Sequence, residues 1–396
     1  MGSATTTHQT GLTVEPTNTI QSGRLLGLSW LHFLNDGSAN YLPGILPAVL
    51  ISLHQSVTLA GFVMGALLIG QALQLPCGWL ADRFGGRMFI IFGMLGVSVA
   101  ASVIGLAGSL YALIPALMII GLCSALFHPQ ALAAARRLSG RRAGMGMSIF
   151  MIGGEVGRGI WPLLASILVV TWGRQSLVFL AIPAIISAVL LWRTLPVQPS
   201  KPKALSTPIA WRAHLPALGV LVGFQSMRAL AIFGASTFLP ILWHVRGRSL
   251  TEGATLITVL LVVGVVGNFA GGHLADKIDR HLILRGSSGA AAILLALFLV
   301  IGGPLQWVVL GLLGVFMFAT QPTGVLMGQE ILPENRSLGS GIALGFSNGV
   351  AALGVVILGF LVGYLTAYGI LWVMVGALSI AFLLSFSPLL YHQKRS

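Results

Sequence analysis

One stretch decides the fold of this chain: residues 78–87 read GWLADRFGGR and form the densest cluster of charge in the first 130 residues. Apolar runs long enough to cross a bilayer lie on both sides of it. A weaker copy, GHLADKIDR, occupies residues 272–280 and begins 194 residues later. A motif that ends one membrane span, turns on glycine, starts the next span and then recurs indicates two copies of one membrane unit.

The composition points to the membrane. Of the 396 residues, 56% are hydrophobic and only 8% are charged, whereas a soluble domain has about 25% charged residues. The net charge of +13 would suit a nucleic-acid-binding protein. We exclude that class, because the basic residues lie in loops between apolar runs. The sequence therefore predicts an all-α polytopic membrane protein.

The apolar runs predict twelve transmembrane helices. Their expected residue ranges are 25–52, 58–80, 88–107, 110–135, 144–171, 175–194, 214–243, 252–275, 282–302, 305–329, 338–365 and 368–390.

Matching landmarks divide the spans into two six-helix halves with pseudo-symmetry. Four pairs recur in order at offsets between 193 and 197: Pro43 and Pro240, Asp82 and Asp276, Pro129 and Pro322, Gly144 and Gly339. We expect bundles at 24–194 and 213–390, a cytoplasmic linker at 195–212, a disordered cytoplasmic tail at 1–23 and a cytoplasmic tail at 391–396. Such repeats place a binding site near the bilayer midplane, between the halves.

The distribution of Lys and Arg predicts the orientation. With the N-terminus inside, seventeen of these residues lie on the cytoplasmic side and three on the outer side. This bias predicts that both termini are cytoplasmic in the inner (plasma) membrane.

Polar groups inside the spans are candidates for function, because they are costly there. Span 1 carries His32 and Asp36, four residues apart on one helix face. A carboxylate and an imidazole at this spacing can share a proton, so we expect a proton-coupling site. The alternative is that Asp36 only holds neighbouring helices together.

Three further charges lie within spans. Glu155 and Arg158 are three residues apart and form either a plain local ion pair or a pair that a substrate anion or a proton can switch. Arg228 has no acidic neighbour in the sequence, so it needs a carboxylate from another helix or an anionic ligand. Asp36 is the expected partner, because spans 1 and 7 are equivalent in the repeat. The remaining candidates for substrate binding are Asn35, His128, Gln130, Gln321 and Asn348.

The two loop motifs are expected to serve as gate loops or, alternatively, as topology anchors only. Glycines permit the sharp turn, and the charged side chains pair with acids, helix ends or lipid phosphate. The residues concerned are Gly78, Asp82, Arg83, Gly85, Arg87, Asp276, Lys277 and Arg280.

The first loop resembles the major facilitator superfamily signature G-x-L-A-D-R-x-G-x-R, and the rest of the chain resembles the fosmidomycin-resistance group of efflux proteins. The residues that carry the second resemblance are HFLND at 32–36, FHPQ at 127–130, SIFMIGG at 148–154, PLLA at 162–165 and QEILP at 329–333. The resemblance implies the major facilitator fold, a gate latch in the loop, and export of small molecules or drugs by proton antiport.

The chain departs from that group at three places, one of which is Arg158, where the group normally has a small or apolar residue. Gln130 stands where the group has a carboxylate, and Glu155 stands where it has asparagine. We interpret this as the transfer of an acidic function from span 4 to span 5.

The leading hypothesis is therefore a proton-coupled exporter of a small compound or drug, with anions among the candidates, that works by alternating access. An importer or facilitator of an organic anion is the alternative, since one fold serves both. A membrane enzyme or receptor is disfavoured, because the sequence shows no metal-ligand cluster and no nucleophile motif. We expect protons and membrane lipids as partners, no cofactor, no nucleic acid and a monomer.

Overall fold

The computed structural model describes residues 20–56, 59–73, 77, 80, 86–140, 143–195, 209–275 and 277–390. The predicted C-terminal tail, most of the N-terminal tail and residues 196–208 of the linker lie outside this part. Within it, helix α1 already begins at Ser22 and α9 at Trp211, so the ends of the predicted tail and linker are helical.

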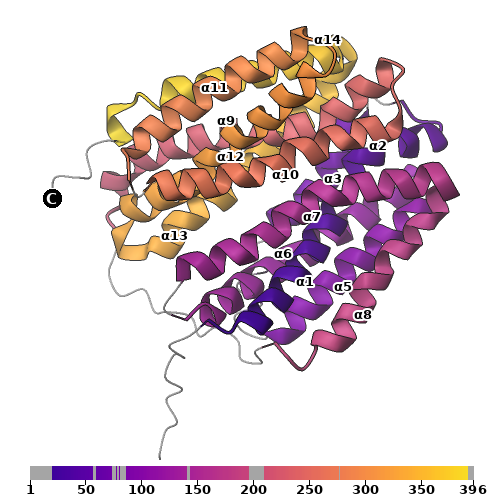
Figure 1. The fold of residues 1–396 in the computed structure, drawn as a ribbon, viewed down its shortest axis with the longest axis horizontal. Helices are drawn as coiled ribbons and strands as arrows, with labels where there is room; N and C mark the ends of the chain where they lie inside the picture. The colour runs from indigo at the N-terminus through magenta and orange to yellow at the C-terminus, as the bar shows by residue number, and fades with distance from the viewer. Residues whose placement is uncertain are drawn as a thin grey trace, which may run out of the picture.

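All the regular elements among the described residues are helices (Figure 1). The first group of elements is α1 (Ser22–Asn40), α2 (Leu42–Ser52), α3 (Ala60–Ala72), α5 (Arg87–Ser102), a 3₁₀ turn (Val103–Leu106), α6 (Leu110–Leu138), α7 (Ala143–Trp172), a 3₁₀ segment (Arg174–Ala181) and α8 (Ile182–Leu191). The second group is α9 (Trp211–Val245), α10 (Leu250–Ala275), α11 (Arg280–Val300), α12 (Leu305–Ile331), a 3₁₀ turn (Pro333–Asn335), α13 (Arg336–Gly341), a π-helical turn (Ile342–Phe346), α14 (Ser347–Leu384) and a 3₁₀ turn (Pro388–Leu390).

Nine stretches among the described residues are long and apolar enough to cross a membrane. The last of them, Leu338–Leu384, contains predicted span 11 and most of predicted span 12. Thr366 breaks it with φ 60° and ψ 164°, which is where the sequence predicted the turn between these spans. Predicted span 1 corresponds to α1 and α2, and span 2 to the shorter apolar helix α3, so the helices are consistent with twelve spans.

Predicted span 1 is wrong in one respect, because it is two helices rather than one. Helix α1 ends at Asn40, and α2 begins at Leu42 with Pro43 in its first turn. Proline has no N–H group to continue the hydrogen-bond ladder from α1, so the ladder is interrupted at this point. The proline that marks the repeat therefore also interrupts the first span.

The helices gather in two groups, α1–α8 and α9–α14, which lie side by side in Figure 1. The groups touch through α7 and α10, through α3 and α14, and through α2 with both α9 and α10. At the contact of α3 and α14, a Cβ atom added to Gly61 would lie 2.0 Å from the Gly359 Cα atom. Only glycine permits two helix backbones to approach this closely.

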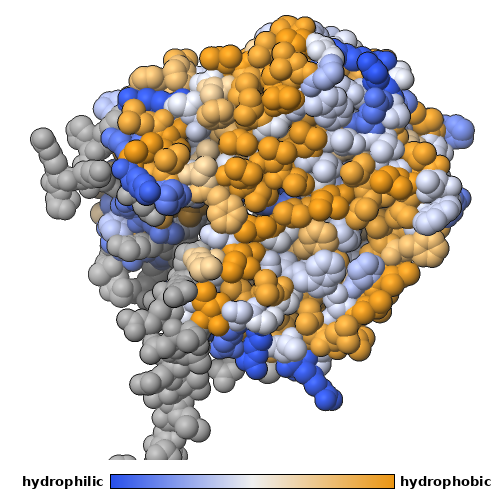
Figure 2. All heavy atoms as spheres, viewed as in Figure 1, coloured by the Kyte–Doolittle hydropathy of each residue, from blue (hydrophilic) through white to orange (hydrophobic). Residues whose placement is uncertain are grey.

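The surface is apolar over most of the face in Figure 2, and the hydrophilic residues lie mainly toward its edges. Large apolar side chains of many helices are exposed, among them Val189, Ile293, Phe360 and Leu383. Exposed apolar surface of this extent marks a contact with lipid or protein. Together with the nine apolar helices, it identifies a multi-pass membrane protein.

Candidate functional site

The candidate site is centred on Asp36, a buried carboxylate in the second half of α1. Helix α7 lies close to this part of α1, because glycines form its facing surface. A Cβ atom on Gly154 would lie 2.4 Å from the ring of His32, and one on Gly157 would lie 2.3 Å from the Phe33 carbonyl oxygen. The two glycines therefore allow side chains of α7 to reach Asp36.

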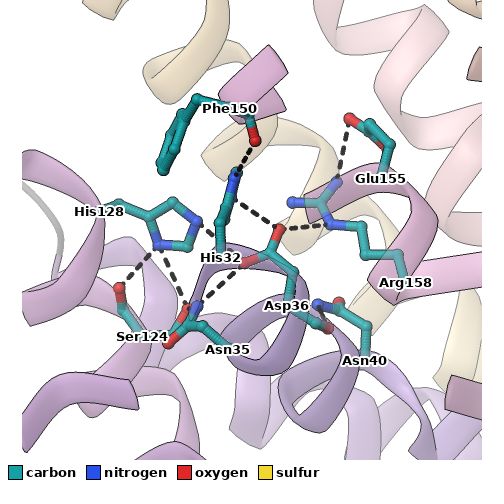
Figure 3. Close-up of polar contacts among 9 residues, drawn as sticks. All are labelled: His32, Asn35, Asp36, Asn40, Ser124, His128, Phe150, Glu155 and Arg158. Carbon is teal, nitrogen blue, oxygen red and sulfur yellow. Dashed lines mark hydrogen bonds and ion pairs between the residues drawn. The ribbon is translucent and has the colours of Figure 1, made fainter. Parts of the chain in front are cut away.

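Asp36 contacts side chains from three helices (Figure 3). His128 Nε2 of α6 lies 3.1 Å from Asp36 Oδ1, and Asn35 Nδ2 donates to the same oxygen at 2.9 Å. Arg158 Nε of α7 donates to Oδ2 at 3.0 Å, and His32 Nε2 lies 3.4 Å from Oδ2. The carboxylate is thus surrounded by nitrogen atoms, as a buried charge requires.

Backbone carbonyls orient both imidazole rings. His32 Nδ1 donates to the Phe150 carbonyl oxygen at 2.9 Å, and His128 Nδ1 donates to the Ser124 carbonyl oxygen at 2.8 Å. Because a carbonyl oxygen only accepts, each Nδ1 atom carries a proton. A neutral ring then has only a lone pair at Nε2, which repels an ionised carboxylate. The contact between His128 and Asp36 is favourable only when a proton lies between Nε2 and Oδ1.

Arg158 lies between two carboxylates. Its Nε atom bonds Asp36, whereas its Nη1 atom is 3.9 Å from Glu155 Oε1. The predicted pair of Glu155 and Arg158 therefore exists, but the shorter contact of the arginine is to Asp36. Glu155 is buried, and its Oε2 atom has no hydrogen-bond partner within the described residues.

The predicted pairing of Arg228 with Asp36 is wrong. Asp36 points toward α6 and α7 of its own helix group, where it contacts His128 and Arg158. Arg228 Nε donates instead to Gln225 Oε1 at 3.2 Å on its own helix, α9. The guanidinium is buried, and Nη1 is without a hydrogen-bond partner among the described residues.

The other predicted binding residues divide between several places. Asn35 and His128 belong to the cluster around Asp36. Gln130 is directed away from it, because its Oε1 atom accepts from the Gly86 N–H at 3.1 Å, where α5 begins. Gln321 of α12 and Asn348 of α14 are half-buried in the second helix group.

Most of the predicted gate loop lies outside the described residues, namely Gly78, Asp82, Arg83, Gly85 and Asp276. Of the rest, Arg87 stacks on the Trp192 ring at 4.7 Å. Arg280 forms an ion pair with Glu330, which joins the start of α11 to the end of α12. Lys277 is exposed.

Asp279 takes a structural role in the second loop. Its side chain caps α11 by accepting from the His281 N–H at 3.0 Å. Asp279 stands where the first loop motif has Gly85, and it therefore serves to start a helix.

The sequence predicted no metal-ligand cluster, yet folding brings three possible ligand atoms of His32, Asp36 and His128 within 4.8 Å of one another. Arg158 already bonds Asp36 Oδ2, and its positive charge opposes a divalent cation there.

Two elements of the site were missed by the sequence reasoning. Ser124 lies near both Asn35 Nδ2 (3.5 Å) and His128 Nδ1 (3.4 Å), and its position four residues before His128 was a usable signal. Thr258 Oγ1 of α10 donates to the Gly159 carbonyl oxygen of α7 at 2.6 Å and so joins the two helix groups. No spacing in the sequence indicates this second contact.

Comparisons with known proteins agree with this architecture. The chain is 28% identical over 372 residues to the "Uncharacterized MFS-type transporter YfnC" of Bacillus subtilis (strain 168), covering 88% of this chain and 89% of the relative. It is 26% identical over 352 residues to the fosmidomycin resistance protein of Escherichia coli (strain K12), covering 86% of each.

The fold is also similar to solved structures. A bacterial homologue of the human lysosomal transporter Spinster, in an inward-facing and unoccupied conformation, superposes with a TM-score of 0.77 at 19% identity, covering 92% of this chain and 96% of that one. The sequence model described as Major Facilitator Superfamily matches residues 28–350. The chain belongs to the Major Facilitator Superfamily of transporters.

Proposed function

We propose that this protein is a secondary active transporter that exports a small compound or drug in exchange for protons by alternating access. The name of the similar fosmidomycin resistance protein supports an export role. The observation that carries the proton coupling is the buried contact between Asp36 Oδ1 and His128 Nε2.

This contact can hold a transported proton. The proton lies on the imidazole when Asp36 is ionised, or on the carboxyl group when His128 is neutral. His128 is 20% exposed and Asp36 only 3%, so His128 is the member that exchanges protons with water. The charged and titratable groups facing the pair are His32 on α1 and both Glu155 and Arg158 on α7.

Arg158 links the proton to the rest of the site. When a proton neutralises Asp36, the attraction that holds Arg158 at 3.0 Å is weakened. Glu155, already 3.9 Å from the other side of the guanidinium, then becomes the stronger partner. When Arg158 moves toward Glu155, it neutralises more of the negative charge that Glu155 presents toward the second helix group. Protonation of Asp36 is thereby coupled to substrate binding.

The contacts between the helix groups support an assignment of the conformation. Thr258 lies near the start of α10 and contacts Gly159 in the middle of α7, while Gly61 lies near the start of α3 and contacts Gly359. The starts of α3 and α10 are the helix ends that the distribution of Lys and Arg places outside. We assign the structure to an inward-facing state, closed at the outer end. In the proposed cycle these contacts separate and the opposite end closes.

The proposal includes the cellular setting. Seventeen basic residues on one side against three on the other support an inner-membrane protein with both termini in the cytoplasm. The twelve spans are proposed to form two six-helix halves, 24–194 and 213–390, within one monomeric transporter surrounded by lipid.

One observation favours the alternative, an importer or facilitator of an organic anion. Arg228 is a buried cation whose Nη1 atom has no protein partner among the described residues, and it would bind an anion whichever way the substrate moves. The direction of transport separates the two functions.

A growth panel in an efflux-deficient bacterium tests the proposal. The wild-type protein is expected to protect against at least one compound, and Asp36→Asn is expected to abolish protection at equal membrane abundance. Uptake of that compound into inverted vesicles, driven by acidification of their lumen, would support export. Greater sensitivity of the cells to an anionic compound, with no protection against any other, would favour import.

A further inference from the structure

Buried polar atoms without partners gather in the second helix group near Arg228. They are Arg228 Nη1 and Gln225 Nε2, each on a side chain that is at least nine-tenths buried. Arg228 and Gln225 touch directly, and a Cβ atom on Gly324 would lie 2.2 Å from Gln225 Nε2. Helix α9 therefore presents two buried hydrogen-bond donors in one place, next to Gly324 of α12.

The first helix group contains a buried hydrogen-bond acceptor, where the second group contains donors. Glu155 Oε2 is a buried acceptor without a partner in the described part of the chain. Glu155 and Arg228 interact electrostatically, yet no ion pair joins them among the described residues. Glu155 thus offers a buried acceptor in the first helix group, and Arg228 offers a buried donor in the second.

This arrangement is costly unless a ligand completes it. A buried charge or donor without a partner costs more than it returns, so such groups indicate a missing partner. An anion alone would satisfy Arg228 but would leave Glu155 unsatisfied. A cation alone would satisfy Glu155 but would leave Arg228 unsatisfied.

Building on the function proposed above, we infer that the transported compound is amphoteric. Its anionic group, such as a carboxylate, binds Arg228 and Gln225. A cationic or hydrogen-bond-donating group on the same molecule binds Glu155 Oε2. The site thereby selects against lipophilic cations and against simple anions of the same size.

Three probes with one aromatic skeleton test this inference: 4-(aminomethyl)benzoate is a zwitterion, 4-methylbenzoate an anion and 4-methylbenzylamine a cation. Their affinities for the purified full-length protein are measured by calorimetry at pH 7. The zwitterion is expected to bind about 10- to 100-fold more tightly than either single-charge probe, which is the effect of one charge-assisted hydrogen bond.

Variants assign the two ends of the ligand. Glu155→Gln should weaken the zwitterion about 10-fold or more and leave 4-methylbenzoate unchanged. Arg228→Gln should weaken the zwitterion and 4-methylbenzoate but not 4-methylbenzylamine, and Arg228→Lys should restore part of the loss. Arg248→Gln removes one exposed positive charge elsewhere and serves as the control. Gel filtration and the unfolding temperature without ligand show whether each variant is folded.

Three results would overturn the inference: equal affinities of zwitterion and anion, loss of both in Glu155→Gln, or no binding of the zwitterion at millimolar concentration. Binding needs no proton gradient, so the export proposal is tested separately. A zwitterion that binds but does not move under a pH gradient would contradict export and leave the ligand class intact. Proton-driven movement of a simple anion would contradict the amphoteric ligand class and leave the export proposal intact.

Discussion

His128 Nε2 lies 3.1 Å from Asp36 Oδ1, while the opposite ring nitrogen of His128 donates to the Ser124 carbonyl oxygen at 2.8 Å. The backbone contact leaves only Nε2 free to gain or lose a proton. A buried carboxylate and an imidazole from different helices therefore share one proton position. This relationship is the physical basis of the proposed coupling.

Replacing His128 should uncouple transport from the proton. In His128→Gln the amide can still bond Asp36 but cannot carry a proton, so we expect export driven by a pH gradient to fall by about 100-fold or more, as for other lost acid–base groups. Uptake into inverted vesicles measures this.

His32→Gln is the matched comparison for that variant. Its Nε2 atom is farther from Asp36, at 3.4 Å, and its side chain is only 4% exposed, so it should reduce export less. Export by His128→Gln that equals the wild type across the pH range would refute the proposed role.

A side chain at the contact between α3 and α14 should hold that end of the molecule open. A Cβ atom on Gly359 would lie 2.3 Å from the Gly61 Cα atom, so Gly359→Ala forces the backbones apart. Overpacking costs about 1–3 kcal/mol, which shifts the equilibrium toward the open end by about 5- to 150-fold. Spin labels at Ile51 and Val245, on the two sides of the interface, measure the separation after Cys77 and Cys123 are replaced.

Gly363→Ala is the control for the same helix, because nothing lies within 4 Å of its added Cβ atom. It should leave the distance distribution unchanged. If Gly359→Ala behaves like this control, the glycine contact does not limit closure.

Removing the hydrogen bond between the helix groups should have a smaller effect. Thr258→Val removes the bond of 2.6 Å to the Gly159 carbonyl oxygen. Hydrogen bonds between membrane helices contribute about 0.6 kcal/mol, so the open population should rise only about threefold. Thr255→Val removes a bond within α10 alone and should cause no change in the spin-label distances. Equal effects of the two variants would contradict a role specific to the interface.

The helical membrane fold could be predicted from the sequence, because the length and hydropathy of the apolar runs are nearly sufficient to identify membrane-spanning helices. The break at Thr366 was predicted between spans 11 and 12 and is confirmed. The break between Asn40 and Leu42 was not predicted, because the apolar run continues through it. Pro43 had been noted only as a landmark of the repeat. Hydropathy does not report the course of the backbone inside an apolar run.

The candidate site was predictable only along single helices. The spacing of His32 and Asp36 placed them together, and the structure confirms that contact at 3.4 Å. The partner of Arg158 depended on packing between helices, where Gly154 and Gly157 bring α7 against α1. The same limit explains why Arg228 was paired with Asp36 wrongly, since the direction of a side chain around its helix relative to other helices is a tertiary property.

The most direct test of the account uses purified protein in liposomes that contain a pH-sensitive dye. Adding a compound identified by the growth panel, under an imposed pH gradient, should move protons with the wild-type protein. Asp36→Asn should move none, while still binding the anionic group of the compound, because Arg228 is left intact. Proton movement by Asp36→Asn at the wild-type rate would contradict the claim that the proton is carried by Asp36 and His128.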